Sequence, residues 1–319
     1  MNIYENESHY KNIGVRNMSV KIDDSIHKAV LKYRLDNKFS NVTITEYLGN
    51  SLAYKIPEVL EEKQVTKIEK YAFHEHRELE EVSIPKGVIE IGEHSFYNCR
   101  NLLKVIMPDS IRSFGDGAFK NCEKLHTIEI NSIHNQMFSL KGILAELNQE
   151  VIVTIHYEDG DAVLVFPYYM HSFEENTPAR IVTQVTVGSG VHYRECVYRE
   201  DVLYNEYDKI FSAEKNIDVT ESAYKIALNR LAYPYGLSEK KRQEYYKYIY
   251  ENRMKLVDNL LRKEYNDMLQ KLLKLDVLNR ADMETVIEMA RNYGVMQGLT
   301  VLLQYHKEKY GIKNKTFEF

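Results

Sequence analysis

The most constraining feature of this sequence is a spacing of 23 residues, which carries Phe73 onto Phe96 and Phe119. Four more apolar columns keep the same register: Ile68, Ile91 and Phe114; Leu79, Leu102 and Leu125; Val82, Val105 and Ile128; Ile84, Met107 and Ile130. A fixed period in the twenties is typical of a solenoid, in which each repeat buries its apolar side only by stacking on its neighbours. The sequence therefore predicts a repeat architecture between Val65 and Ile130.

Each repeat contains a short strand with period-two alternation. In the strand of Val82, Ser83 and Ile84, the two apolar residues face inward and the serine faces outward, and Pro85 ends the strand because it cannot donate to the ladder. The same alternation defines a six-residue outward face: Glu81, Ser83, Lys104, Ile106, Thr127 and Glu129. We predict that this face binds a protein partner; a merely solvated sheet is the alternative.

The repeats begin irregularly at Val42. Ile56 precedes Pro57 as Ile84 precedes Pro85, but it lies 28 residues before Ile84 instead of 23. The first repeat therefore carries about five extra residues, which we expect in the loop 58–64, because terminal repeats of solenoids are commonly atypical.

Residues 68–130 resemble the BspA-type leucine-rich repeat, whose pattern is roughly Ile-Gly-x-x-Ala-Phe-x-x-Cys-x-x-Leu-x-x-Val-x-Ile-Pro. With the irregular first repeat, the resemblance covers residues 42–130. It implies a right-handed solenoid of short strands that is used for protein–protein contact, often at cell surfaces.

The three cysteines, Cys99, Cys122 and Cys196, are too few for a disulfide framework. Cys99 and Cys122 fall in one repeat column, which indicates stacked small apolar residues; a metal or redox pair is the alternative. No cofactor or metal is predicted.

The chain of 319 residues has 44% hydrophobic residues and a net charge of -5, which favours a folded protein of two or three domains and no general attraction to nucleic acid or membrane. The first residues lack an apolar signal segment, and no window approaches 18 uninterrupted apolar residues. We therefore expect a cytoplasmic protein.

Residues 131–205 differ in pattern from the repeats, and we expect the columns to end at Ile130. The runs 151–157 and 162–169 flank a turn that contains Asp159 and Gly160, which predicts a hairpin. A further strand pair is expected at 179–187 and 191–198. This β-rich module either caps the solenoid or extends its sheet.

The same module contains His192, Glu195 and Cys196, residue types that can form a nucleophilic site. On a strand, however, Glu195 would point away from the other two side chains, so we predict no catalytic residue and no enzyme. The strings at 174–180 and 188–196 resemble segments that accompany leucine-rich repeats in uncharacterised proteins of Gram-positive bacteria. That resemblance covers residues 160–305 and implies no activity.

Residues 1–41 are predicted to form a capping segment, in which 22–35 is either a helix or strands flanking a turn.

Beyond residue 219 the apolar period becomes helical, with helices predicted at 222–233, at 239–262 after the cap Ser238, and at 282–291. Leu269, Leu272 and Leu273 recur thirty residues on as Leu299, Leu302 and Leu303. This array resembles ankyrin repeats, although it departs from their period and lacks their Thr-Pro-Leu-His motif.

The helix at 239–262 also suggests another class of partner. Its tyrosines lie among Lys240, Lys241, Arg242 and Lys247, a combination that could stack on bases and contact phosphate. The chain has 25 tyrosines and no tryptophan, so packing of tyrosines in the core is the alternative.

Together these patterns predict an α+β protein that consists of a short leucine-rich-repeat solenoid, a β-rich middle module and a C-terminal antiparallel helical, ankyrin-like array. The predicted domains are 1–41, 42–130, 131–205, 206–312 and a tail at 313–319. We expect a non-enzymatic cytoplasmic adaptor or scaffold for protein partners; nucleic-acid binding through residues 239–263 is the alternative function.

Overall fold

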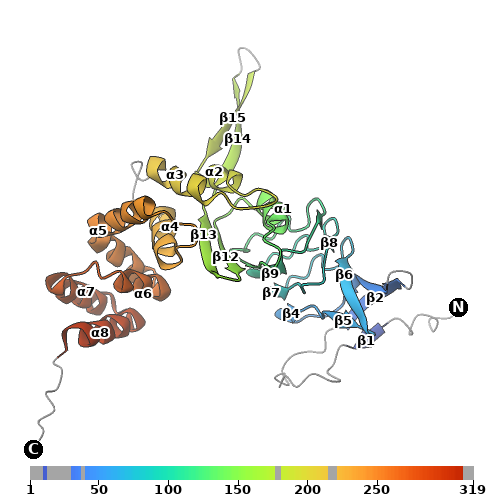
Figure 1. The fold of residues 1–319 in the computed structure, drawn as a ribbon, viewed down its shortest axis with the longest axis horizontal. Helices are drawn as coiled ribbons and strands as arrows, with labels where there is room; N and C mark the ends of the chain where they lie inside the picture. The colour runs from blue at the N-terminus through green and yellow to red at the C-terminus, as the bar shows by residue number, and fades with distance from the viewer. Residues whose placement is uncertain (1–9, 13–29, 37–39, 177–180, 215–220, 312–319) are drawn as a thin grey trace, which may run out of the picture. The chain divides into compact units, whose positions relative to one another are not determined.

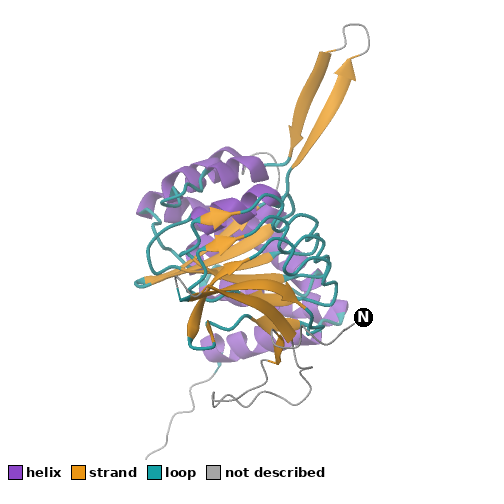
Figure 2. Ribbon diagram, turned by 90° about the vertical axis from the view of Figure 1, so that its right-hand side faces the viewer, coloured by secondary structure: helices purple, strands orange, loops and turns teal. Residues whose placement is uncertain are grey.

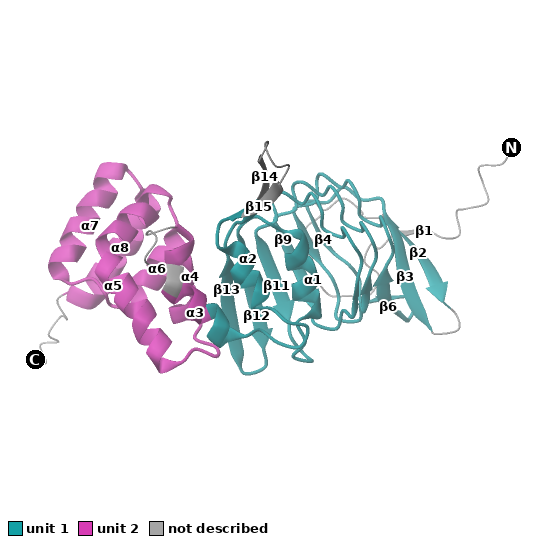
Figure 3. Cartoon of the chain, turned by 90° about the horizontal axis from the view of Figure 1, so that it is seen from above, with its two compact units in different colours: residues 1–207 teal, residues 208–319 magenta. Residues whose placement is uncertain are grey.

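The computed structural model describes residues 10–12, 30–36, 40–176, 181–214 and 221–311. The chain divides into two compact units, residues 1–207 and residues 208–319 (Figure 3). The first is mainly β and the second is helical, as the α+β prediction requires.

Unit 1 is a solenoid whose turns supply strands to two sheets (Figure 1). Sheet A has the order β1 (Tyr10–Asn12), β2 (Val30–Asp36), β3 (Asn41–Tyr47), β6 (Lys63–Ile68), β8 (Glu90–Ile91) and β10 (Ser113–Phe114), with β5 (Val59–Leu60) paired to β6. Sheet B has the order β13 (Gly160–Phe166), β12 (Val151–Tyr157), β11 (Thr127–Asn131), β9 (Lys104–Pro108), β7 (Glu81–Ser83) and β4 (Ala53–Lys55).

The 23-residue period corresponds to one step between parallel strands of sheet B. Glu81 pairs with Lys104, and Lys104 pairs with Thr127. The apolar columns lie inside, where Val105 and Ile128 have no exposed surface. The strands stack with connecting loops at their ends (Figure 2), so the repeat architecture predicted from the apolar spacing is confirmed.

The phenylalanine column forms a stack of rings in the core. The ring centroids of Phe73 and Phe96 lie 4.9 Å apart and those of Phe96 and Phe119 lie 4.7 Å apart, with interplanar angles of 18° and 10°. Tyr47 adds a further ring, 5.1 Å from Phe73. All three phenylalanines are completely buried, so the stack joins successive rungs by apolar contact.

The cysteines of the repeat column are buried beside this stack. The Cys99 thiol donates to the carbonyl of Phe73 at 3.0 Å, and the Cys122 thiol donates to that of Phe96 at 3.3 Å. Burial raises the pKa of Cys99 to about 12 and raises that of Cys122 as well. Both thiols are therefore neutral packing groups. Among the described residues there is no cluster of His, Cys, Asp and Glu able to hold a metal ion.

The solenoid continues beyond Ile130, so the prediction that the columns end there is wrong. Strand β12 pairs in parallel with β11, with Thr127 opposite Ile152. The connection between these strands contains helix α1 (Phe138–Glu146) in place of the short phenylalanine turn, and this substitution hides the period in the sequence. The predicted hairpin is confirmed, since β13 pairs antiparallel with β12; the module extends sheet B.

The prediction that residues 179–187 and 191–198 form a strand pair is wrong. Strand β15 (Ile181–Val187) pairs with β14 (Met170–Asn176), and the segment expected as its partner forms helix α2 (Gly190–Glu195). The Arg194 side chain holds this helix in place. It donates to the carbonyls of Leu147 at 3.0 Å, Pro167 at 2.7 Å and Gln149 at 2.7 Å.

The N-terminal end of the solenoid has an enlarged first rung. Ala53 pairs with Glu81, which confirms the 28-residue step, and the extra residues form the hairpin of β5 and β6. The helical alternative for 22–35 is wrong from Val30 onward, because β2 pairs antiparallel with β3. Residues 22–29 of that prediction, and the predicted tail at 313–319, lie outside the described residues.

Unit 2 contains most of α3 and the helices that follow it. Their bounds are α3 (Tyr204–Glu214), α4 (Glu221–Ala232), α5 (Glu239–Arg262), α6 (Asn266–Lys274), α7 (Arg280–Tyr293) and α8 (Met296–Tyr310). Ser238 caps α5 by accepting from the Lys241 backbone N–H, as predicted. The inward residues predicted for α7 are all buried: Met283, Val286, Ile287 and Ala290.

A buried ion pair joins three helices of unit 2. Asp208 of α3 accepts from Arg230 Nε of α4 at 2.9 Å and from the Tyr245 hydroxyl of α5 at 2.8 Å. A second Arg230 nitrogen bonds the other carboxylate oxygen at 3.0 Å. Both charged side chains are completely buried, so this bidentate pair fixes the helices against one another.

Candidate binding surface

The six residues predicted as the outward face lie together on β7, β9 and β11 of sheet B. The strand register places Glu81, Lys104 and Thr127 in one row. The second row contains Ser83, Ile106 and Glu129. All six residues have intermediate exposure, whereas their neighbours along the strands are buried. The strand pairing therefore forms one continuous face from residues that lie up to 48 positions apart in the sequence.

An ion pair orders the centre of this face. Lys104 Nζ lies 2.9 Å from Glu129 Oε1. The hydrogen bond to Glu129 raises the pKa of Lys104, and the nearby carboxylates of Glu129 and Glu81 add to this effect. The positive charge of Lys104 thus lies near the negative charges of Glu81 and Glu129. Ile106 is the large apolar side chain among the six residues.

The face is wider than the sequence predicted. The register adds Ala53 and Lys55 on one side, and Ile152 and Thr154 on the other. Ile152 was missed because the columns were expected to end at Ile130. The apolar residues at every second position of β12, Val151, Val153 and Ile155, were the signal available in the sequence.

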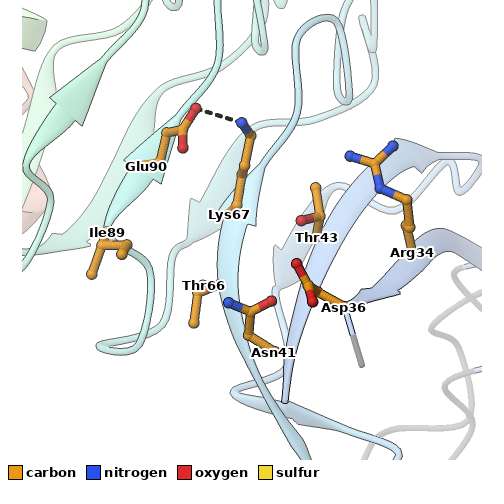
Figure 4. Close-up of a pocket in the computed structure, with 8 residues that line it drawn as sticks. All are labelled: Arg34, Asp36, Asn41, Thr43, Thr66, Lys67, Ile89 and Glu90. Carbon is orange, nitrogen blue, oxygen red and sulfur yellow. Dashed lines mark ion pairs between the residues drawn. The ribbon is translucent and has the colours of Figure 1, made fainter. Parts of the chain in front are cut away.

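A pocket of about 270 Å³ lies on the other sheet (Figure 4). Its lining consists of Arg34, Asp36, Asn41, Thr43, Thr66, Lys67, Ile89 and Glu90. Lys67 and Glu90 form an ion pair across strands at 2.5 Å, and Arg34 pairs with Glu69 at 3.2 Å. Lys67, Glu90 and Arg34 are therefore ion-paired within the protein. These residues do not suggest a catalytic site in the pocket.

The side chains of His192, Glu195 and Cys196 do not form a nucleophilic site. The Cys196 thiol is in a residue only 4% exposed and donates to the backbone carbonyl of His192 at 3.6 Å. The His192 ring instead faces the Glu195 carboxylate at 3.5 Å, in an exposed position. The side chains therefore lack the thiol–imidazole contact that nucleophilic activation requires.

The tyrosines of α5 divide between core and surface. Tyr245 and Tyr248 are buried, whereas Tyr246 and Tyr250 are exposed and stack with centroids 6.5 Å apart. Several basic residues of the helix are ion-paired: Lys241 with Glu244, Lys247 with Glu251 and Arg253 with Asp282. The surface thus offers two aromatic rings, and Lys240, Arg242 and Lys255 of the same helix are exposed without an ion pair to a described residue.

Comparison with protein families identifies the repeats. Residues 51–155, about a third of the chain, match the family described as "BspA type Leucine rich repeat region" in six copies. This segment is a BspA-type leucine-rich repeat region. The match ends within β12, in agreement with the extra rung seen in the structure. Leucine-rich repeats are stacked units that present extended surfaces for protein interaction.

Solved leucine-rich-repeat proteins are similar to about a third of the chain. A leucine rich cell surface protein from Faecalibacterium prausnitzii is 31% identical over 32% of this chain and 31% of its own length, with a TM-score of 0.28. A leucine-rich repeat protein from Bacteroides ovatus is 27% identical over 35% of this chain and 32% of its own, with a TM-score of 0.29. This chain thus spans about a third of the length of each.

Comparison with curated proteins finds no match. For the helical unit, the ankyrin-type resemblance stays a prediction. None of the helices in the described ranges is long and apolar enough to span a bilayer.

Proposed function

We propose that this protein is a non-enzymatic adaptor that binds protein partners on the outward face of sheet B. The observation that supports this most directly is the register of β7, β9 and β11, which gathers the six predicted residues into one ordered, half-exposed face. Parallel strands joined by a buried ring stack make that face rigid, so little conformational entropy is lost when a partner binds.

The chemistry of the face indicates how a partner is recognised. Ile106 supplies apolar contact, and the Lys104–Glu129 ion pair supplies a fixed donor and acceptor pattern beside it. Such an apolar centre with a polar surround is the usual anatomy of a protein interface. The proposed location is the cytoplasm, as expected from the sequence; cell fractionation with an antibody to the native protein tests it.

Affinity purification of the native protein from its source, with mass spectrometry of the bound proteins, tests the function. We expect Ile106→Glu to lose the partners retained by the wild type. Ile89→Glu is the matched control, because Ile89 is exposed immediately before β8 of sheet A, away from sheet B. Equal capture by wild type and Ile106→Glu, at unchanged thermal stability, would remove the sheet B face from consideration.

A further inference from the structure

Strand β4 is the outermost strand of sheet B at the N-terminal end of the solenoid. At the opposite edge, on β13, the Tyr207 hydroxyl accepts from the Val165 N–H at 2.9 Å and donates to the Val165 carbonyl at 2.6 Å. Sheet A continues at the N-terminal end through β2 and β1. Within the described ranges, in contrast, no strand pairs with the outer edge of β4.

The backbone groups on this outer edge can be identified from the bonds on the inner one. The Leu52 carbonyl accepts from the Glu81 N–H at 3.0 Å, and the Ile56 N–H donates to the Ser83 carbonyl at 3.0 Å. Because alternate residues of a strand direct their backbone groups to opposite edges, Ala53 and Lys55 direct theirs outward. An open row of this kind is a template for an additional strand.

Apolar side chains accompany the open edge. Leu48 and Leu52 belong to the same rung as β4 and are 44% and 61% exposed. The aromatic stack also ends here, where the rings of Tyr47 and Tyr54 lie 4.5 Å apart. An added strand would therefore gain apolar contact as well as backbone hydrogen bonds.

The charge at this edge selects the residues of the added strand. Lys55 is exposed and forms no ion pair with a described residue. Across β7 its row continues with Ser83 and then Ile106. An acidic residue directly opposite a lysine stabilises a strand pair. The position beside Lys55 therefore favours Asp or Glu.

A second copy of this chain fits the edge poorly. Sheet A extends past the rung of β3 and β4 by two further strands, β2 and β1. At the usual strand spacing they project about 10 Å beyond β4, where another solenoid joined edge to edge would place its own sheet A. A single strand avoids this collision.

We propose that the outer edge of β4 is a second docking site, which takes a protein partner as an added β-strand of alternating apolar and acidic residues. The site adjoins the outward face of sheet B, to which the side chains of Ala53 and Lys55 also belong, but it uses the backbone edge of β4 and is tested with its own peptide.

Amide hydrogen exchange of the full chain, measured by NMR with a synthetic peptide, tests the proposal. The probe is the blocked peptide Thr-Val-Glu-Val-Glu-Val-Thr, and its control has lysine in place of each glutamate. We expect the Ala53 and Lys55 amides to exchange quickly in the free protein and at least about tenfold more slowly with saturating acidic peptide. The lysine peptide should bind more weakly.

Two variants locate the effect. Ala53→Pro removes a donor on the outer edge without removing a bond to β7, so it should abolish peptide protection of Lys55, whereas Ala53→Val should retain it. Lys55→Glu should reverse the preference between the two peptides. Protection in Ala53→Pro equal to that in wild type, no protection of the wild type by the acidic peptide, or slow exchange of both amides in the free protein would each overturn the proposal.

Discussion

At the scale of single residues, Glu146 completes the hydrogen bonding of the last phenylalanine turn. The backbone N–H of Phe73 donates to the carbonyl of Ser95 in the next rung at 2.7 Å, and that of Phe96 donates to Ala118 at 2.8 Å. The next rung has α1 in place of a phenylalanine turn, and the N–H of Phe119 donates to Glu146 Oε2 at 2.6 Å. A side chain of α1 thus replaces the carbonyl of a further repeat.

Removing this carboxylate should destabilise unit 1. In Glu146→Ala the Phe119 N–H, in a residue with no exposed surface, loses its acceptor. An unsatisfied buried donor costs about 1–3 kcal/mol. Urea denaturation measures this loss. Glu123→Ala, at an exposed position, is the control and should change the free energy of unfolding by less than about 0.5 kcal/mol; equal effects would contradict the role of Glu146.

The same residue should make stability depend on pH. Burial raises the pKa of Glu146 above its ordinary value, against the opposing effect of the Phe119 and Ala118 N–H groups. Between the ordinary and the raised pKa the folded state holds more protons than the unfolded state, so the stability contributed by Glu146 falls as pH rises. Relative to non-titrating Glu146→Gln, the wild type should therefore gain stability as pH falls through this window. Thermal unfolding at a series of pH values measures the difference; a constant or opposite trend would contradict the assignment.

At the scale of elements, the buried pair of Asp208 and Arg230 should be the most sensitive point of unit 2. Asp208→Ala leaves Arg230 buried without its counter-charge, which typically costs about 3–5 kcal/mol. Glu251→Ala is the matched control, because its ion pair with Lys247 is exposed and such pairs contribute about 0–1 kcal/mol. Circular dichroism of helix unfolding in denaturant compares the two variants. Similar losses would show that the buried pair has no special role.

The elements that the sequence predicted well are those with local signals. The apolar columns indicated the rungs, and Ser238 marked the start of α5. Helix α1 was missed because its first turn has no acidic residue and Met137 provides no side-chain cap. Helix α2 was missed because Arg194 holds it through carbonyls as distant in sequence as Leu147. The alternation alone placed the central six residues on the outward face of sheet B, but the width of that face depends on pairings that only the fold supplies.

At the scale of the whole molecule, the alternative of nucleic-acid binding makes a separate prediction. The net charge of -5 opposes binding to phosphate, and Lys241 and Lys247 of α5 are already ion-paired. We expect no retention on heparin at low salt. Retention that falls steeply as salt rises would support nucleic-acid binding, and loss of that retention in a variant with both Tyr246→Ala and Tyr250→Ala would locate it on α5.

The central claim is that sheet B binds the protein partner through its outward face. Isothermal titration calorimetry of the purified partner against wild type, Ile106→Glu and Ile89→Glu tests it most directly. An acidic residue at the centre of the interface should weaken binding by about tenfold or more, whereas Ile89→Glu on sheet A should bind like the wild type. Unchanged affinity in Ile106→Glu, or a loss confined to Ile89→Glu, would contradict the account.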